Sequence, residues 1–406
     1  MTSHPGRRYI SIWSLRLCAI ALVVFLGVQA GSAEPAVRPD SVVAFVVTSD
    51  VHYGILRGKF RGQAAVESRV VNAALVQAIN HLPETPLPGD RGLRAGQTVG
   101  AIDFVAITGD IANRQEAVPI QIQSAAVSWH QFTHDFVNGL TIINSAGQRA
   151  QLLPVPGNHD ATNAIGHFNR LNPATDASAL AGIYNLTMRP AAPRTKDTYD
   201  YVRDNIHYSL DFPGLHVVFL TVWPDSRARA WMETALKAVP STTPVIIFCH
   251  DPPAVGASHL TNPNGRHDLN KRDKFENLLS DQLAGGTTTE ASTAIEQRAL
   301  VAFLKAHPNI VAYFHGHNNW SEFYTWRGPD EDIALPTFRV DSPMKGKYSG
   351  PDEAKLSFQL AVYDPATQRM TVRECRWNSP AIAKGGAPSI GWGESVTVSL
   401  APRRQP

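Results

Sequence analysis

Five apolar, β-branched stretches of this chain each end in a short polar segment, and this recurrence limits its possible folds more than any other feature. The stretches are Val42 to Val47, Ile102 to Ile107, Leu152 to Val155, Val245 to Phe248 and Ile310 to Phe314. Near-continuous hydrophobic runs of about four to eight residues are typical of strands that are buried on both faces. Segments with helical spacing lie between them, so the pattern predicts an α/β protein.

The polar segments are rich in residues that bind metals. They are Asp50-Val51-His52, Gly109-Asp110, Gly157-Asn158-His159-Asp160, Cys249-His250 and His315-Gly316-His317-Asn318-Asn319. In α/β sheets, ligands bind in the crevice at the carboxyl ends of the strands. We therefore expect the five segments to converge on one site, although they lie far apart along the chain.

The residue types in these segments favour a site for two cations. One ion can be held by Asp50, His52 and Asp110. The other can be held by Asp110, Asn158, His250 and His317. Imidazole, carboxylate and amide ligands suit manganese, iron or zinc, and there are no thiolates of the kind that mark structural zinc. Two cations about 3.5–4 Å apart favour in-line displacement at phosphorus and lower the pKa of a bridging water.

The five segments resemble the signature of the calcineurin-like metallophosphoesterase superfamily. That signature reads D-x-H, G-D, G-N-H-D or G-N-H-E, a single His after a strand, and G-H-x-H. The matching segments extend from Asp50 to Asn319, which is most of the chain. The resemblance implies a four-layer αββα sandwich of two mixed β-sheets flanked by helices. It also implies a metal-dependent phosphoester hydrolase in which a metal-bridging hydroxide attacks phosphorus in line.

The same resemblance implies a role for each residue of the site. Six of them bind the metals: Asp50 and His52 the first ion, Asp110 both ions, and Asn158, His250 and His317 the second. His159 protonates the leaving oxygen. Asp160 holds His159 in the required tautomer, since a carboxylate beside an imidazole commonly fixes the orientation of the ring.

The last segment departs from the family pattern. Where a second His is expected after Gly316-His317-Asn318, the chain has Asn319, which offers an amide oxygen in place of a ring nitrogen. Residues two apart on an extended segment point to the same face, so His315 and His317 are an alternative pair. Because the family glycine stands directly before the first His, as Gly316 does, we favour His317 with Asn319.

The first two segments distinguish the chain from purple acid phosphatases. Members of that subtype have Gly at the place of His52 and Tyr at the place of Asn113. We therefore do not expect an iron-tyrosinate centre.

The first 33 residues have the pattern of a secretory signal peptide. Arg7 and Arg8 precede an apolar run of 12 residues, Leu17 to Val28, and Gly31-Ser32-Ala33 offers small residues for cleavage. The run is shorter than the roughly 20 residues that a membrane-spanning helix needs. A retained anchor is the alternative, because Tyr9 to Trp13 is also apolar.

Three regions are expected: a signal peptide over 1–33, the metallophosphoesterase domain over 34–378, and a C-terminal tail over 379–406 with room for an extra strand. Cleavage after residue 33 predicts a periplasmic or secreted protein without a stable membrane span. Cys249 and Cys375 then remain, and such a compartment permits a disulfide between them. Their spacing does not support one, and we expect Cys249 to be a small core residue.

The charge of the mature chain bears on its partners. Without residues 1–33, 34 basic residues stand against 35 acidic ones, so the net charge is −1. This balance argues against nucleic acid or an anionic membrane as an electrostatic partner, and a small phosphorylated substrate is expected. No cluster of arginines accompanies the motifs, which slightly favours phosphodiesters over phosphomonoesters.

A non-catalytic function is the alternative. Asn319 would then mark a weakened metal site in an exported protein that binds phosphorylated ligands without turnover. His159 and Asp160 argue against this alternative, because turnover requires them and binding does not.

Apolar periodicity and turn residues predict the other elements. Helices are expected over 66–79, 125–137, 225–237 and 294–306, and a hairpin over 356–375. Two long connections, 161–205 and 254–291, begin directly after ligand segments. We expect these connections to select the substrate, with solvated surface loops as the alternative.

Overall fold

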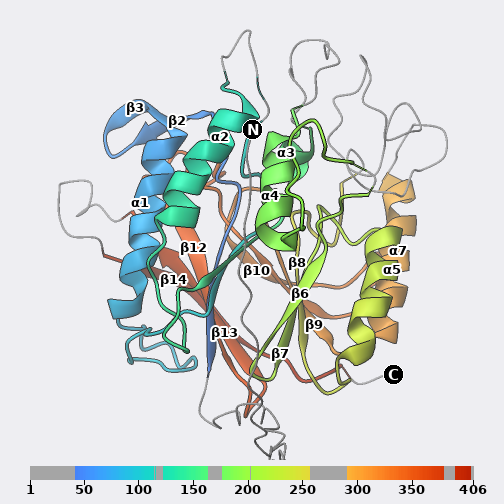
Figure 1. Cartoon of the computed structure of the whole chain (residues 1–406). Coiled ribbons are helices and arrows are strands. Elements are labelled where there is room, and N and C mark those ends of the chain that lie inside the picture. The colour runs from blue at the N-terminus through green and yellow to red at the C-terminus, as the bar shows by residue number, and fades with distance from the viewer. Residues whose placement is uncertain are drawn as a thin grey trace, which may run out of the picture. The chain divides into compact units, whose positions relative to one another are not determined.

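The computed structural model describes residues 42–113, 115, 122–162, 176–201, 203–256, 290–378 and 389–403. The predicted signal peptide and most of the predicted connection 254–291 lie outside this part of the chain. Two six-stranded mixed sheets form the centre of the described fold (Figure 1).

The first sheet has the strand order β14-β13-β12-β1-β4-β5. Its parallel half consists of β1 (Val43–Thr48), β4 (Phe104–Ile107) and β5 (Gln151–Pro154). Its antiparallel half consists of β12 (Ser357–Asp364), β13 (Arg369–Arg376) and β14 (Gly391–Ser399). β1 lies at the centre of this sheet and is fully buried, as its continuous apolar run predicts.

The second sheet has the strand order β10-β11-β9-β8-β7-β6. Its central strands run parallel: β11 (Leu335–Arg339), β9 (Ile310–His315), β8 (Val245–Phe248) and β7 (Leu215–Phe219). The edge strands β10 (Glu322–Trp326) and β6 (Tyr208–Phe212) are antiparallel to their neighbours. A separate hairpin joins β2 (Leu56–Phe60) to β3 (Gln63–Glu67).

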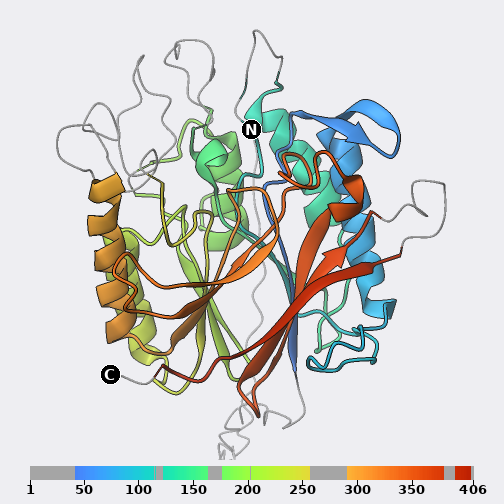
Figure 2. The same cartoon turned by 180° about the vertical axis from the view of Figure 1, so that it is seen from behind.

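Helices cover the outer face of each sheet. The first sheet is covered by α1 (Ser68–His81), α2 (Ala125–Phe132) and α4 (Ser178–Met188), and the second by α5 (Ser226–Ala235) and α7 (Glu290–Ala306). In Figures 1 and 2, α1 and α2 lie on the side opposite α5 and α7, and α4 stands between them. The short helix α3 (Asn158–Thr162) follows β5. This arrangement confirms the predicted four-layer αββα sandwich.

Alternating side chains of β1 supply two different cores, because successive residues of a strand point to opposite faces. Ala44 and Val46 pack with the covering helices, whereas Phe45 faces the second sheet. The ring of Phe45 stacks on that of Phe104, with centroids 4.6 Å apart, and meets Phe248 of β8 edge-on at 5.8 Å. Aromatic packing therefore joins the two sheets at their centre.

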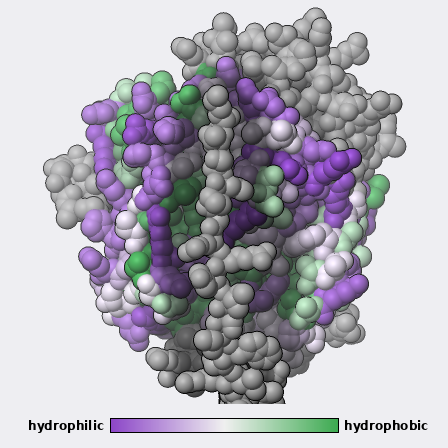
Figure 3. Space-filling model, viewed as in Figure 1, coloured by the Kyte–Doolittle hydropathy of each residue, from purple (hydrophilic) through white to green (hydrophobic). Residues whose placement is uncertain are grey.

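The surface fits this layering. In the view of Figure 3, hydrophilic residues dominate the described surface, and hydrophobic residues form smaller groups among them. On α1, the buried residues Val71, Leu75 and Ile79 recur at helical spacing, and Val70 is a single exposed exception. No helix in the described ranges is both long and apolar enough to span a membrane.

Three local predictions need correction. The helix expected from residue 66 begins at Ser68, because β3 continues to Glu67. The helix expected over 125–137 changes after Phe132 into a π-helical segment, Thr133–Asn138. The expected connection 161–205 contains α4 within its described part. Cys249 and Cys375 are free and buried, so they form no disulfide.

Candidate active site

The predicted ligands lie just beyond the carboxyl ends of neighbouring parallel strands. Asp50 follows β1, Asp110 follows β4, Asn158 begins α3 after β5, His250 follows β8, and His317 follows β9. Backbone bonds keep the ends of β1 and β4 together: the Asp50 amide donates to the Gly109 carbonyl at 3.0 Å. The first three residues come from one sheet and the two histidines from the other, so the site lies where the sheets adjoin.

Side chains from separate segments form three groups that can each hold a cation. The groups are Asp50, Asp110 and His250; His52, Asp110 and His159; and His250, Asp251 and His317. Within each group the ligand atoms lie within 4.8 Å of one another. Asp110 belongs to two of these groups. The groups mix the predicted ligand sets, because Asp50 is grouped with His250, and His159 is grouped with His52.

Several buried ligand atoms of this cluster have no hydrogen-bond partner among the described residues. They are Oδ1 of Asp50 and both ring nitrogens of His52. His52 Nε2 lies 3.6 Å from Asp50 Oδ1 and 3.5 Å from Asp110 Oδ2. Leaving buried polar atoms unpaired costs free energy, and bound cations would remove this cost. The residues present therefore fit divalent metal ions.

His250 is oriented across the two sheets. Its Nδ1 lies 2.8 Å from the carbonyl oxygen of Thr108, which can only accept a hydrogen bond. The proton therefore sits on Nδ1, and Nε2 faces Asn158 Oδ1 at 2.9 Å and Asp110 Oδ1 at 3.5 Å. A carbonyl that fixes the tautomer and leaves Nε2 for a metal is the usual outer-shell arrangement.

The cluster shifts the pKa values of its own members in different directions. Burial opposes the charge of His250, but the carboxylates of Asp110, Asp50 and Asp251 raise its pKa to about 9. Burial, together with the charge of Lys345, lowers the pKa of His52. For Asp50, burial acts upward, but the His52 and His250 imidazoles and the Ser49 hydroxyl hold the pKa below its usual range. Metal binding must displace the proton of His250.

The backbone at the ligands is strained. Asp50, His52, Asp110, His317 and Asn319 all have positive φ, between 38° and 65°. Such conformations are rare for residues other than glycine and gather at functional sites. The five ligand positions are therefore held in place by the surrounding structure.

Close backbone approach explains the glycine before His317. A Cβ atom on Gly316 would lie 1.8 Å from Ser49 Oγ and 2.3 Å from Asp50 Oδ2. The His317 amide donates to the same Asp50 oxygen at 2.9 Å. The Gly-His pair of the last segment thus brings the first and last ligand segments together.

His159 lies at the cluster, but Asp160 does not orient it as expected. The His159 amide donates to Asp110 Oδ1 at 2.8 Å, and its ring nitrogen Nε2 lies 3.9 Å from Asp110 Oδ2. The Asp160 carboxylate instead accepts from the backbone amides of Ile111, Ala112 and Gly157, at 2.8 to 3.0 Å. Asp160 therefore ties two ligand segments together through their backbone.

The two alternatives for the last segment, His315 with His317 and His317 with Asn319, differ in their geometry. His315 is fully buried in β9, where Nδ1 lies 3.0 Å from the Gly316 carbonyl and Nε2 lies 2.9 Å from the Tyr324 hydroxyl. It is in none of the three groups. Asn319 directs Nδ2 to the His317 carbonyl at 2.8 Å, which leaves its buried Oδ1 as a candidate ligand. The structure therefore places His317, but not His315, in the ligand cluster, and Asn319 stays a predicted additional ligand.

Sequence reasoning missed two residues at this site. Asp251, fully buried, has Oδ1 3.8 Å from His317 Nδ1. Its place directly after a ligand at a strand end was an available signal. Lys345 reaches His159 from a loop beyond β11, and it carries no motif.

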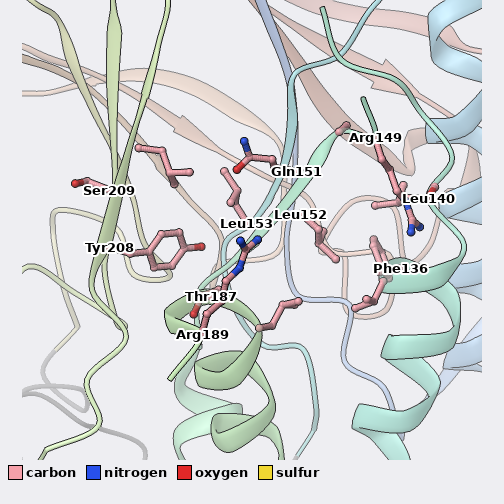
Figure 4. Close-up of a pocket in the computed structure, with 14 residues that line it drawn as sticks. Phe136, Leu140, Arg149, Gln151, Leu152, Leu153, Thr187, Arg189, Tyr208 and Ser209 are labelled. Carbon is pink, nitrogen blue, oxygen red and sulfur yellow. Dashed lines mark hydrogen bonds between the residues drawn. The ribbon is translucent and has the colours of Figure 1, made fainter. Parts of the chain in front are cut away.

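A separate pocket lies away from the ligand segments. It has a volume of about 450 Å³ and lies between the edge strands β5 and β6, next to the end of α4 (Figure 4). Leu152 and Tyr208 contribute apolar walls, and Arg189 lies at the end of α4. None of the predicted site residues lines it.

Three solved structures align with this chain at low sequence identity. A dimetal phosphatase from Danio rerio is 13% identical, with 89% of this chain and 100% of that chain covered and a TM-score of 0.47. A phosphopantetheinyl hydrolase from Mycobacterium tuberculosis is 12% identical, with 74% and 90% covered and a TM-score of 0.33. Vps29 from Chaetomium thermophilum is 9% identical, with 88% and 98% covered and a TM-score of 0.30. These similarities are too weak to transfer any property.

Among curated proteins, none matches this chain by sequence. The model of the calcineurin-like phosphoesterase family, in contrast, matches residues 43–334. This range contains every predicted ligand and His159. Membership implies two divalent metal ions, and the candidate ligand groups agree with that requirement. The chain therefore belongs to the calcineurin-like phosphoesterase family and is a metal-dependent phosphoesterase.

Proposed function

We propose that this protein is an exported hydrolase that cleaves phosphate esters of small molecules by in-line attack of water. The observation that supports this most strongly is the cluster around Asp110. Its carboxylate belongs to two ligand groups, and neighbouring Asp50 and His52 atoms are buried without hydrogen-bond partners in the described part of the chain.

Two divalent cations, when bound, would supply a water of lowered pKa and offset negative charge at the phosphoryl group. Asp50, His52 and Asp110 would hold the first of them, with Asn319 as an additional oxygen ligand. Asp110, Asn158, His250 and His317 would hold the second. Because the donors are imidazole, carboxylate and amide groups, we propose manganese, iron or zinc.

His159 is the proposed proton donor. In the proposed reaction, a bond forms between the water oxygen and phosphorus, and the bond from phosphorus to the leaving oxygen breaks. The imidazolium of His159 gives its proton to that oxygen, which leaves as an alcohol. The position of the ring supports this role: its Nε2 lies 3.9 Å from Asp110 Oδ2, and its centroid lies 4.8 Å from that of His52.

Export is proposed from the pattern of residues 1–33. Mass spectrometry of the protein recovered from a secreting host tests it. A mature chain that begins at Glu34 supports export with cleavage. An intact Met1 in all of the protein would contradict cleavage, and absence of the protein from the exported fraction would contradict export.

Hydrolysis is tested with p-nitrophenyl phosphate and bis-p-nitrophenyl phosphate. Protein stripped with a chelator is reloaded with manganese, iron or zinc, and the release of p-nitrophenol is measured. We expect activity with at least one metal and none in the stripped protein. Activity that survives complete metal removal, or none with any metal, would refute the proposal. The sequence slightly favoured the diester because no cluster of arginines accompanies the motifs, and the position of Lys345 beside His159 bears on that preference.

A further inference from the structure

Lys345 places an ammonium group beside the proposed proton donor. Its Nζ lies 3.2 Å from His159 Nε2 and 3.3 Å from Asn113 Oδ1. His159 belongs to the ligand group of His52 and Asp110, and the His52 and His159 rings are 4.8 Å apart. A positive charge is thus present on the side of the site where the phosphoryl group and its leaving oxygen must lie.

The loop that carries Lys345 is attached to the first and last ligand segments. Ser342 Oγ donates to the carbonyl of Asp50 at 2.8 Å and accepts from the amide of Lys345 at 2.8 Å. Further along the loop, the Lys347 amide donates to the Asn319 carbonyl at 2.6 Å. The backbone that holds the metal ligands therefore also holds the lysine in position. Such preorganisation favours substrate binding, because little order has to be gained when the substrate arrives.

A buried arginine bonds to the backbone of the loop that carries Lys345. The guanidinium of Arg57, which is 2% exposed, donates to the carbonyl oxygens of Pro343 and Ser349. These bonds fix both sides of Lys345 along the chain. A surface lysine that only kept the protein soluble would not require a loop held by buried hydrogen bonds.

We propose that Lys345 binds the phosphoryl oxygen that carries the second negative charge of a phosphomonoester, so that the site prefers monoesters to diesters. This inference rests on the proposed function. A monoester has a second ionisation near pKa of about 6 and so carries almost two charges at neutral pH. A diester carries one charge, because the second ester bond removes the ionisable oxygen. In its ammonium form the lysine can donate to His159 Nε2 in the free protein and would turn to the phosphoryl oxygen when substrate binds, so it acts through charge and hydrogen bonding.

The test compares Lys345→Met with the matched control Lys347→Met. Lys347 is exposed on the same loop, but its Nζ lies over the Trp320 ring, 4.3 Å from the centroid, rather than at His159. The two p-nitrophenyl esters share a leaving group, so a difference between them reports on the charge of the phosphoryl group. Metal content is measured for each variant.

In Lys345→Met, kcat/KM should fall about 10- to 100-fold for p-nitrophenyl phosphate, the effect of losing a charged hydrogen bond. For bis-p-nitrophenyl phosphate it should change less than about 3-fold, because the diester lacks the second charged oxygen. Lys347→Met should leave both values unchanged. Equal losses for both esters, or no loss for the monoester, would overturn the assignment.

Binding of inorganic phosphate, measured by calorimetry on the metal-loaded protein, gives a readout that does not depend on turnover. Phosphate should bind about 10-fold or more weakly to Lys345→Met than to the wild type and to Lys347→Met. Unchanged phosphate affinity would count against the proposal. If the wild type hydrolyses neither ester, the proposed function fails, and the phosphate measurement alone decides the role of Lys345.

Discussion

Gly316 illustrates how single residues set the geometry of the ligand cluster. The His317 amide reaches Asp50 Oδ2 at 2.9 Å only because no side chain stands between the two segments. Ser49 Oγ donates to the same carboxylate oxygen at 2.6 Å, so this oxygen is held by bonds from both segments. The other oxygen, Oδ1, is left for a cation.

In Gly316→Ala, the added methyl group should push the last segment away from Asp50. We expect weaker metal binding, activity lowered at least about 10-fold, and an unfolding free energy lowered by about 1–3 kcal/mol. Gly58→Ala is the matched control, because a Cβ there meets nothing within 4 Å. Metal titration and chemical denaturation measure both effects. Metal affinity that is equal in the two variants would show that the close approach is unimportant.

His159→Gln should separate turnover from metal binding. Glutamine retains a polar side chain but cannot protonate the leaving oxygen, so kcat should fall about 100-fold or more. The His159 backbone amide still donates to Asp110 Oδ1, so metal content should stay at the wild-type level. Steady-state kinetics with elemental analysis measures the two quantities. Loss of metal in proportion to loss of activity would contradict the role of proton donor.

At the residue scale, the motifs identified the side chains that converge but not how they are held. The Asp160 carboxylate bonds to backbone amides of Ile111, Ala112 and Gly157, and because neighbouring residues on a helix do not face each other, its side chain diverges from that of His159 in α3. Asp251 was missed because it lies outside the family motif. Lys345 could not be found, since nothing local in the sequence indicates that a loop beyond β11 returns to His159.

At the element scale, the strands with continuous apolar runs, including the edge strand β5, were predictable, whereas the edge strands β6 and β10 were not and β14 was expected only as a possible strand of the tail. β1, β4 and β8 are buried along their whole length, which gives a clear hydrophobic run. β6 and β14 lie at sheet edges and mix exposed with half-buried residues, so no such run marks them. Helices α1, α5 and α7 were recognisable because each packs one face on a sheet.

Substitution of Phe45 tests how much the packing between the two sheets contributes to stability. It is fully buried in β1, stacks on Phe104 and meets Phe248 and Phe314 edge-on. Phe45→Ala should lower the free energy of unfolding by about 3–5 kcal/mol, because the cavity lies between two rigid sheets. Urea denaturation measures the change. A loss below about 1 kcal/mol would show that the sheets adjust to fill the space.

At the scale of the whole molecule, the four-layer architecture followed from the alternation of strands and helices together with the family resemblance. The strand order within each sheet did not. β12 and β13 complete the first sheet from the distant end of the chain, beside β1. Local patterns do not specify which strand pairs with which over such separations, so the topology had to come from the structure.

Stability should depend on pH through Asp341. Burial raises the pKa of this carboxyl to about 8, although Ser349 and Arg57 act in the opposite direction. The unfolded chain loses this proton near pH 4, so between about pH 4 and pH 8 the unfolded state binds fewer protons and stability falls as pH rises.

Asp341→Asn keeps the side chain neutral at every pH. Relative to the wild type, its free energy of unfolding should therefore rise by about 2 kcal/mol or more between pH 5 and pH 8.5. The value at pH 5, where the wild-type group is protonated, serves as the internal control. A constant difference at the two pH values would mean that Asp341 is ionised in the folded protein.

The central claim is that Asp110 holds two cations jointly, and elemental analysis of metal-loaded wild type and Asp110→Asn tests it most directly. We expect about two ions per chain in the wild type. In the variant we expect fewer than one, with the circular dichroism spectrum of the fold retained. A wild type that never binds more than one ion per chain, or a variant that binds as many ions as the wild type, would contradict the claim.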